Sequence, residues 1–196
     1  MSEVDNGNLA GTNAKNMGAG LSLAVNILED MNSMQPSAWV MWDILDKHKD
    51  AEFVAPNGTN SEANTSNAQH IGTWGVGMVN HDTKEIELTQ KYYVYGQFTK
   101  YINPGDTIIA SSPTTLAAYN KDTGAIKIVA VNTTGDTQNY RFDLSAFSQT
   151  GTSAKIIRTS GSFTDGEHWK DVGTAEVKDG KFRFDLPANS VTTFDD

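Results

Sequence analysis

The sequence predicts an α/β portion followed by an all-β portion, with the change near "YINPGD" (101–106). Two observations predict this. Apolar residues recur at helical spacing before Gly105, and short runs of strand length recur between turn signals after it. We therefore expect two domains, 1–105 and 106–196, and the second should be an antiparallel β-sandwich.

The first portion contains two stretches with one apolar helix face each. The first helix is expected at about 14–32 and should end before Pro36. The second helix is expected after "IELTQ" (86–90). The residues that define the two faces are Leu21, Ala24, Val25, Leu28 and Met31 in the first, and Val94, Phe98, Tyr101 and Ile102 in the second.

Between the helices we expect one buried strand, one long loop and one hairpin. The run "AWVMWD" (38–43) is short and mostly apolar, as in a strand that is buried on both faces of a parallel sheet. Residues 45–73 are polar and without period, which is typical of a functional loop. Alternation on either side of residues 81–84 indicates a hairpin turn.

The second portion contains eight candidate strands with turn residues between them. The turns are expected at 120–124, 133–136 and 178–181. The strand candidates are "TIIAS", "TLAAYN", "AIKIVAVN", "QNYRFDL", "AKIIRTS", "GTAEVK", "KFRFDL" and "SVTTF".

Composition excludes several classes of partner. A net charge of −9 disfavours nucleic acid and anionic membrane surfaces, and no apolar run is long enough to insert into a membrane. Cysteine is absent, so no thiol nucleophile or thiolate metal site is possible. No charged and apolar leader precedes Ser2, so we expect no signal peptide in this chain. We expect no cofactor.

The histidines and glycines do not form a catalytic motif. His48, His70, His81 and His168 are not at metal-ligand spacing, and no Gly-x-Ser-x-Gly or phosphate-binding glycine pattern is present, so we expect no metal. Aromatic residues are more informative. Because residues three apart in a strand face opposite sides, one of the two tryptophans of "AWVMWD" should pack on a helix while the other faces a cleft, although both could be core residues.

Four segments together resemble glycoside hydrolase family 30. "KYYVYGQFTKYINPG" (91–105) resembles the last barrel helix and its exit, and "PSAWVMWD" (36–43) resembles the eighth barrel strand. "AVNTTGDTQNYRFDLSAF" with "IIRTSGSF" resembles the middle of the side β-domain, and "LPANSVTTF" resembles its final strand. The matches occur in the family's order along nearly the whole chain.

This resemblance implies a (β/α)8 barrel followed by the sandwich, of which the chain would hold only the C-terminal part, from the end of strand seven to helix eight and onward. It also implies a retaining β-glycosidase that uses two glutamates. "MSE" corresponds to the nucleophile motif, so Glu3 is the expected nucleophile. The acid/base glutamate would lie outside this chain, which we therefore expect to be inactive alone.

The resemblance also bears on substrate and partners. This chain has no arginine before Arg141, which favours a neutral β-linked glycan, galactan-like or glucoside, over an acidic xylan. We expect the whole protein to be extracellular or on the cell surface. The missing barrel or a second copy could cover apolar faces of the helix at 14–32 and of "AWVMWD". Expected substrate-binding residues are Trp42, Asp43, Trp39 and Trp74.

The alternative is a non-catalytic module. In this reading the sandwich folds alone and either stabilises a barrel or binds carbohydrate through exposed aromatic residues such as Tyr119, Phe163 or Trp169.

Overall fold

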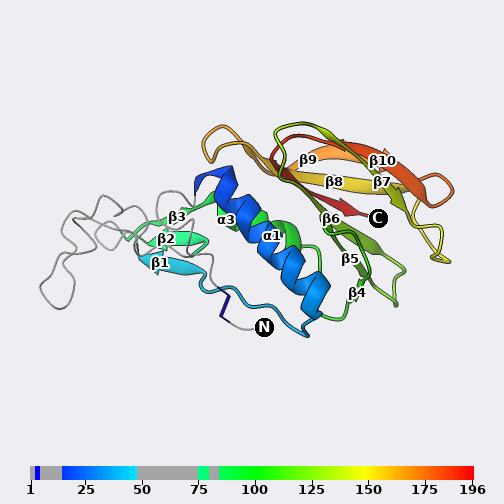
Figure 1. The fold of residues 1–196 in the computed structure, drawn as a ribbon, viewed down its shortest axis with the longest axis horizontal. Helices are drawn as coiled ribbons and strands as arrows, with labels where there is room; N and C mark the ends of the chain where they lie inside the picture. The colour runs from blue at the N-terminus through cyan, green and yellow to red at the C-terminus, as the bar shows by residue number, and fades with distance from the viewer. Residues whose placement is uncertain (1–2, 5–14, 48–74, 80–83) are drawn as a thin grey trace, which may run out of the picture.

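The computed structural model describes residues 3–4, 15–47, 75–79 and 84–196. These residues form two helices and eleven strands, whose labels follow Figure 1. The helices are α1 (Met17–Met34) and α3 (Gln90–Thr99). The strands are β1 (Leu45–Lys47), β2 (Gly77–Val79), β3 (Ile86–Leu88), β4 (Thr107–Ile109), β5 (Thr115–Tyr119), β6 (Ile126–Asn132), β7 (Gln138–Asp143), β8 (Ser153–Ser160), β9 (Glu167–Glu176), β10 (Lys181–Leu186) and β11 (Ser190–Asp195).

A small sheet of order β1-β2-β3 lies at one end of the molecule (Figure 1). β1 runs parallel to β2, with Leu45 opposite Gly77, and β2 runs antiparallel to β3. The β2–β3 pair confirms the expected hairpin strands. Of the expected turn at 81–84, residues 81–83 lie outside the described residues, and Lys84 has a positive φ of 64°. Residues 48–73 of the long loop expected at 45–73 also lie outside the described residues, whereas β1 occupies the loop's first residues.

The large sheet has the order β4-β5-β6-β11-β8-β9, and all its neighbours are antiparallel. A separate ribbon pairs β7 with β10. All eight strands expected after residue 105 are confirmed. The sequence placed the start of β9 six residues too late, because "EHWKDV" shows no alternation: Trp169 has a positive φ of 51° and the β8–β9 register shifts twice.

Two cores lie on opposite faces of the large sheet, because successive strand residues point to opposite sides. Val129, Val131 and Val191 face α1 and α3. Ile128 and Phe194 face the β7–β10 ribbon. The result is three layers, with the large sheet between the two helices and the ribbon (Figure 1).

The apolar face of α1 is covered by this sheet. Leu23, Ala24 and Leu28 are at most 1% exposed, and α1 contacts β5, β6 and β11. The expectation that this helix face is free for association was therefore wrong, because the sheet buries it. The helix ends at Met34, where Gln35 takes a left-handed conformation just before Pro36.

Buried hydrogen bonds hold α3 on the sheet. The Gln97 Nε2 donates to Thr159 Oγ1 at 2.8 Å, and Thr193 Oγ1 donates to Gln97 Oε1 at 2.6 Å. All three side chains are fully buried, so these bonds fix the helix in one register. Of the apolar face expected for α3, Val94 and Phe98 are buried, whereas Tyr101 and Ile102 lie beyond its last residue.

The prediction of a strand buried on both faces at 38–43 was wrong. This segment makes only one isolated bridge, between Met41 and Val4, and Val40 and Trp42 are each about half exposed, at 50% and 51%. Among the described residues this backbone bonds to Val4 through one bridge and to Val76 through the Asp43 carbonyl, and neither contact extends into a ladder. The described helices are all too short or too polar to span a membrane.

Candidate active-site edge

The segments that carry Glu3 and Trp42 lie side by side and run in the same direction. Val4 N–H donates to the Val40 carbonyl at 3.0 Å, and Trp42 N–H donates to the Val4 carbonyl at 2.8 Å. This is the hydrogen-bond pattern of neighbouring parallel strands. The exposed side chain of Glu3 therefore stands one residue from the bridge that holds Trp42.

Glu3 has an unusual backbone. Its φ is +60°, in the left-handed region that non-glycine residues rarely occupy. Residues in such conformations are concentrated at active sites and ligand clamps, where the surrounding structure holds them. In this conformation the Glu3 side chain points in a different direction from that of a residue in an extended strand.

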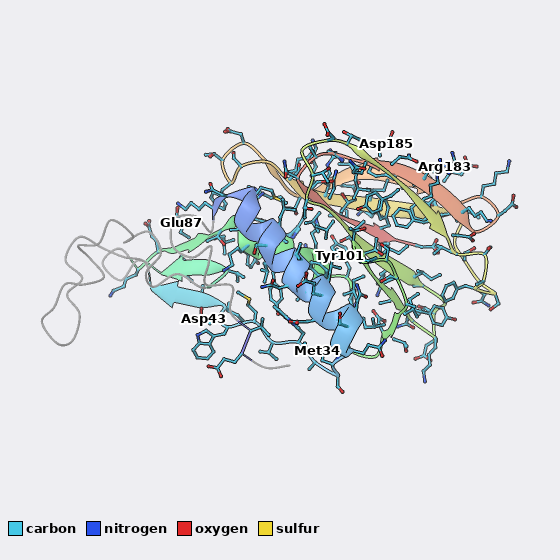
Figure 2. The ribbon with its side chains drawn as sticks, viewed as in Figure 1. Met34, Asp43, Glu87, Tyr101, Arg183 and Asp185 are labelled. Carbon is cyan, nitrogen blue, oxygen red and sulfur yellow. The ribbon has the colours of Figure 1, made fainter. Side chains whose placement is uncertain are left out.

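Trp42 and Asp43 continue this edge toward the small sheet. The peptide bond between them is cis. The Asp43 carbonyl accepts a hydrogen bond from Val76 N–H at 3.2 Å, and the Ile44 carbonyl accepts one from Gly77 N–H at 2.9 Å. Figure 2 shows Asp43 beside the small sheet, close to β1. The half-exposed Trp42 thus projects from a backbone that is anchored on both sides.

Trp39 has a different environment. Its Nε1 donates to Asp30 Oδ2 of α1 at 2.7 Å, and its ring packs on Tyr95 of α3 with centroids 6.0 Å apart. It also lines a groove of about 350 Å³ between the C-terminal ends of both helices. Trp39 therefore connects the 38–43 segment to both helices, and its indole N–H is already bonded to Asp30.

Tyr95 contacts the 38–43 segment through a hydrogen bond with the Met41 backbone. Burial raises the pKa of its phenol, and a hydrogen bond from the Met41 backbone opposes that rise by stabilising the phenolate form. The phenol therefore stays neutral and holds Met41, the residue that pairs with Val4. Asp30 and Tyr95 were both missed from sequence. A signal existed for Asp30, since an acid in the last turns of a helix opposes the helix dipole and needs a specific partner.

The expected site residues are thus only partly brought together. Glu3 and Trp42 share one edge with Asp43 next to them, Trp39 is partly buried against the helices, and Trp74 lies outside the described residues. Within the described part of the chain, no group of three or more His, Asp or Glu side chains is placed to hold a metal ion.

The aromatic residues proposed as an exposed carbohydrate platform on the sandwich are half-buried instead. Tyr119 packs on Phe147 at 5.3 Å. Trp169 donates from Nε1 to the Tyr93 carbonyl at 2.6 Å, and Lys100 covers its ring at 3.8 Å from the centroid. Phe163 packs on His168 at 5.4 Å. Their faces are used in packing, so the expectation of exposed platforms was wrong.

Comparison with known proteins supports the predicted resemblance. No family model matches the chain. An endo-β-1,6-galactanase of Hypocrea rufa is 25% identical over 180 residues, which cover 90% of this chain and 32% of the galactanase. The chain thus spans about a third of the length of this curated relative.

Solved structures share the fold. A family 30 subfamily 8 xylanase from Clostridium acetobutylicum matches with a TM-score of 0.64 and 24% identity, over 100% of this chain and 41% of the xylanase. A family 30 endoxylanase from Clostridium papyrosolvens matches with a TM-score of 0.61 and 20% identity, over 100% and 40%. The chain thus resembles a curated galactanase in sequence and family 30 glycoside hydrolases in fold, as the sequence predicts.

Proposed function

We propose that this chain is the C-terminal part of a retaining β-glycoside hydrolase in which Glu3 is the nucleophile. The observation that carries the proposal is the parallel bridge between Val4 and Met41, which sets Glu3 beside Trp42 at one edge. In (β/α)8 enzymes, catalytic residues stand where neighbouring parallel strands end. The left-handed conformation of Glu3 and the similarity to a galactanase add support.

In this mechanism a Glu3 carboxylate oxygen forms a bond to the anomeric carbon while the bond to the leaving oxygen breaks. The leaving oxygen takes a proton from a second carboxylic acid, which later deprotonates the attacking water. One carboxylate cannot perform both tasks. The second glutamate would belong to sequence outside this chain, and we propose that residues 1–196 alone are inactive.

Trp42 and Asp43 would form the substrate rim in this mechanism. The half-exposed indole of Trp42 offers a flat apolar face for a sugar ring, and Asp43 can accept hydrogen bonds from hydroxyl groups. Trp39, bonded to Asp30, would position this rim without touching the sugar. The name of the galactanase relative and the lack of arginine before Arg141 favour a neutral β-linked glycan. Such a polymer would be met outside the cell or at its surface.

Azide rescue tests the role of Glu3. The gene upstream of the Met1 codon is first read for an in-frame acid/base "Asn-Glu" site, and the enzyme encoded by the whole frame is expressed. Glu3→Ala should lose hydrolysis of an aryl β-galactoside, and added azide should restore turnover with an α-galactosyl azide as product. Trp42→Ala serves as the control, since it should weaken substrate binding without responding to azide.

Two results would count against the proposal. A β-galactosyl azide would make Glu3 the acid/base residue. Hydrolysis by residues 1–196 alone, abolished in Glu3→Gln, would show that this chain needs no further carboxylate.

A second role, stabilisation of the barrel portion by the sandwich, is favoured by the shared core. The large sheet buries α1 and α3, and the bonded set of Gln97, Thr159 and Thr193 clamps α3 to it. We expect Gln97→Ala to lower the melting temperature and Gln97→Glu to lower it further, because the buried carboxylate would lack the donor to Thr159. Unchanged melting of both variants would contradict this role.

A further inference from the structure

The β7–β10 ribbon has one apolar face and one charged face. Phe142 and Phe182 pair on the inner side, with ring centroids 4.5 Å apart, against the core. The exposed side chains alternate with them and point outward. Figure 2 shows Arg183 and Asp185 on the outer surface of the ribbon, on the side away from α1.

Arg141 and Arg183 stand directly opposite each other on this outer face. They are two of the three arginines in the chain. Like charges at directly opposite positions destabilise a sheet, and a bound anion between them would offset this repulsion. The third arginine, Arg158, is held in a two-point ion pair with Glu167.

The charged neighbours of the arginine pair are already bonded to other groups. Lys181 Nζ lies 3.0 Å from Asp143 Oδ2, and Asn139 Nδ2 donates to Asp185 Oδ1 at 2.7 Å. Throughout the described ranges, neither guanidinium forms a hydrogen bond or ion pair. The two exposed guanidinium groups are therefore available together for one anion. A guanidinium group binds a carboxylate through two parallel hydrogen bonds.

A polar cavity adjoins Arg141 at the open edge of β7. Its volume is about 370 Å³, comparable with small-molecule sites. Its walls are fixed by internal bonds: Tyr140 Oη donates to the Val131 carbonyl at 2.9 Å, and the Asn132 amide donates to the Pro187 carbonyl at 2.9 Å. The hydroxyl, amide and guanidinium groups that line it come from Thr114, Thr134, Gln138, Asn139, Tyr140 and Arg141.

We propose that this face binds a carboxylate-bearing polysaccharide, with the carboxylate between Arg141 and Arg183 and a neighbouring sugar ring in the cavity. The choice of a polysaccharide rests on the proposed function. Asp143 and Asp185 flank the arginines, and the whole chain carries −9, so dense polyanions such as nucleic acid are disfavoured. A largely neutral polymer with scattered carboxylates fits both this face and the neutral glycan expected at Glu3.

The test is affinity gel electrophoresis of the chain in gels that contain a uronate-bearing galactan or the same polymer after carboxyl reduction. The wild-type chain should be retarded more by the uronate polymer. The Arg141→Gln/Arg183→Gln variant should bind it about tenfold more weakly, a change of about 1.4 kcal/mol. Lys121→Gln, which removes an exposed charge elsewhere, is the matched control and should bind like wild type. Since all three side chains are exposed, Lys121→Gln should melt like wild type, and the arginine variant should melt at the same temperature or slightly higher because two opposed like charges are removed.

Several results would overturn the proposal: equal binding by the arginine variant and wild type, no retardation of wild type, equal binding of the carboxyl-reduced polymer, or tighter binding of heparin or double-stranded DNA. The measurement needs no turnover. A protein without hydrolase activity could therefore still show this site, and a working hydrolase could lack it.

Discussion

Gly96 leaves room in α3 for the indole of Trp169, and Gly96→Ala tests how firmly that ring is held. A Cβ at position 96 would come within 2.8 Å of Trp169 Nε1 and closer still to its Cζ2. The ring cannot retreat freely, because Nε1 is bonded to the Tyr93 carbonyl and Lys100 covers one face. Alanine gains about 0.5–1 kcal/mol in a helix interior. Overpacking costs about 1–3 kcal/mol, and a lost hydrogen bond about 1 kcal/mol more.

The expected net result is destabilisation by about 2 kcal/mol, measured by equilibrium urea unfolding. Gly18→Ala in α1 is the matched control. Its Cβ would meet no atom within 4 Å, so stability should stay level or rise by up to about 1 kcal/mol. In a Trp169→Ala background, Gly96→Ala should lose most of its cost, because the clashing ring is gone. A Gly96→Ala variant as stable as wild type would refute the reasoning.

Two further predictions concern the sandwich. Phe182→Ala should lower the free energy of unfolding by about 3–5 kcal/mol, because the 6%-exposed ring packs on Phe142 and Phe194, and Phe182→Leu should cost clearly less in the same urea titration. A hydrogen bond from Arg158 lowers the pKa of Glu167 from 4.5 to about 2. The ionised Glu167 therefore stabilises the fold fully above pH 4.5, and this stabilisation is lost as the pH falls toward 2. Melting temperatures of Glu167→Gln should accordingly fall less steeply than wild type over that range, and parallel curves would contradict this.

The strands after residue 105 were predictable because turn residues and strand patterns agree there. At 178–181, "KDGK" places Asp179 and Gly180 at positive φ, of 52° and 70°, as a two-residue hairpin requires. In β9 the turn residues and the strand pattern do not agree in this way. Most of its side chains are partly exposed on both faces, so no alternation marks its start.

The layer arrangement and the candidate site were only partly predictable. Periodicity shows that the α1 face is covered, and it carries no information on whether a barrel or the following sheet covers it. The Trp39–Asp30 bond and the Arg141–Arg183 pairing depend on packing and register, which join residues far apart in sequence. The repeated "RFD" at 141–143 and 183–185 puts one arginine in each strand, but only the antiparallel register sets the two arginines opposite each other.

The position of β11 sets an order of assembly. This strand lies between β6 and β8 and pairs residue by residue with both, yet it follows every other strand of the large sheet in sequence. Domains fold from the N-terminal side as the ribosome releases them, at about 5–20 residues per second. Until residues 190–195 emerge, β4–β6 and β8–β9 are two separate meanders, each with an unsatisfied edge. A chaperone that shields those edges on the nascent chain would therefore act at the moment when this protein is most prone to aggregate.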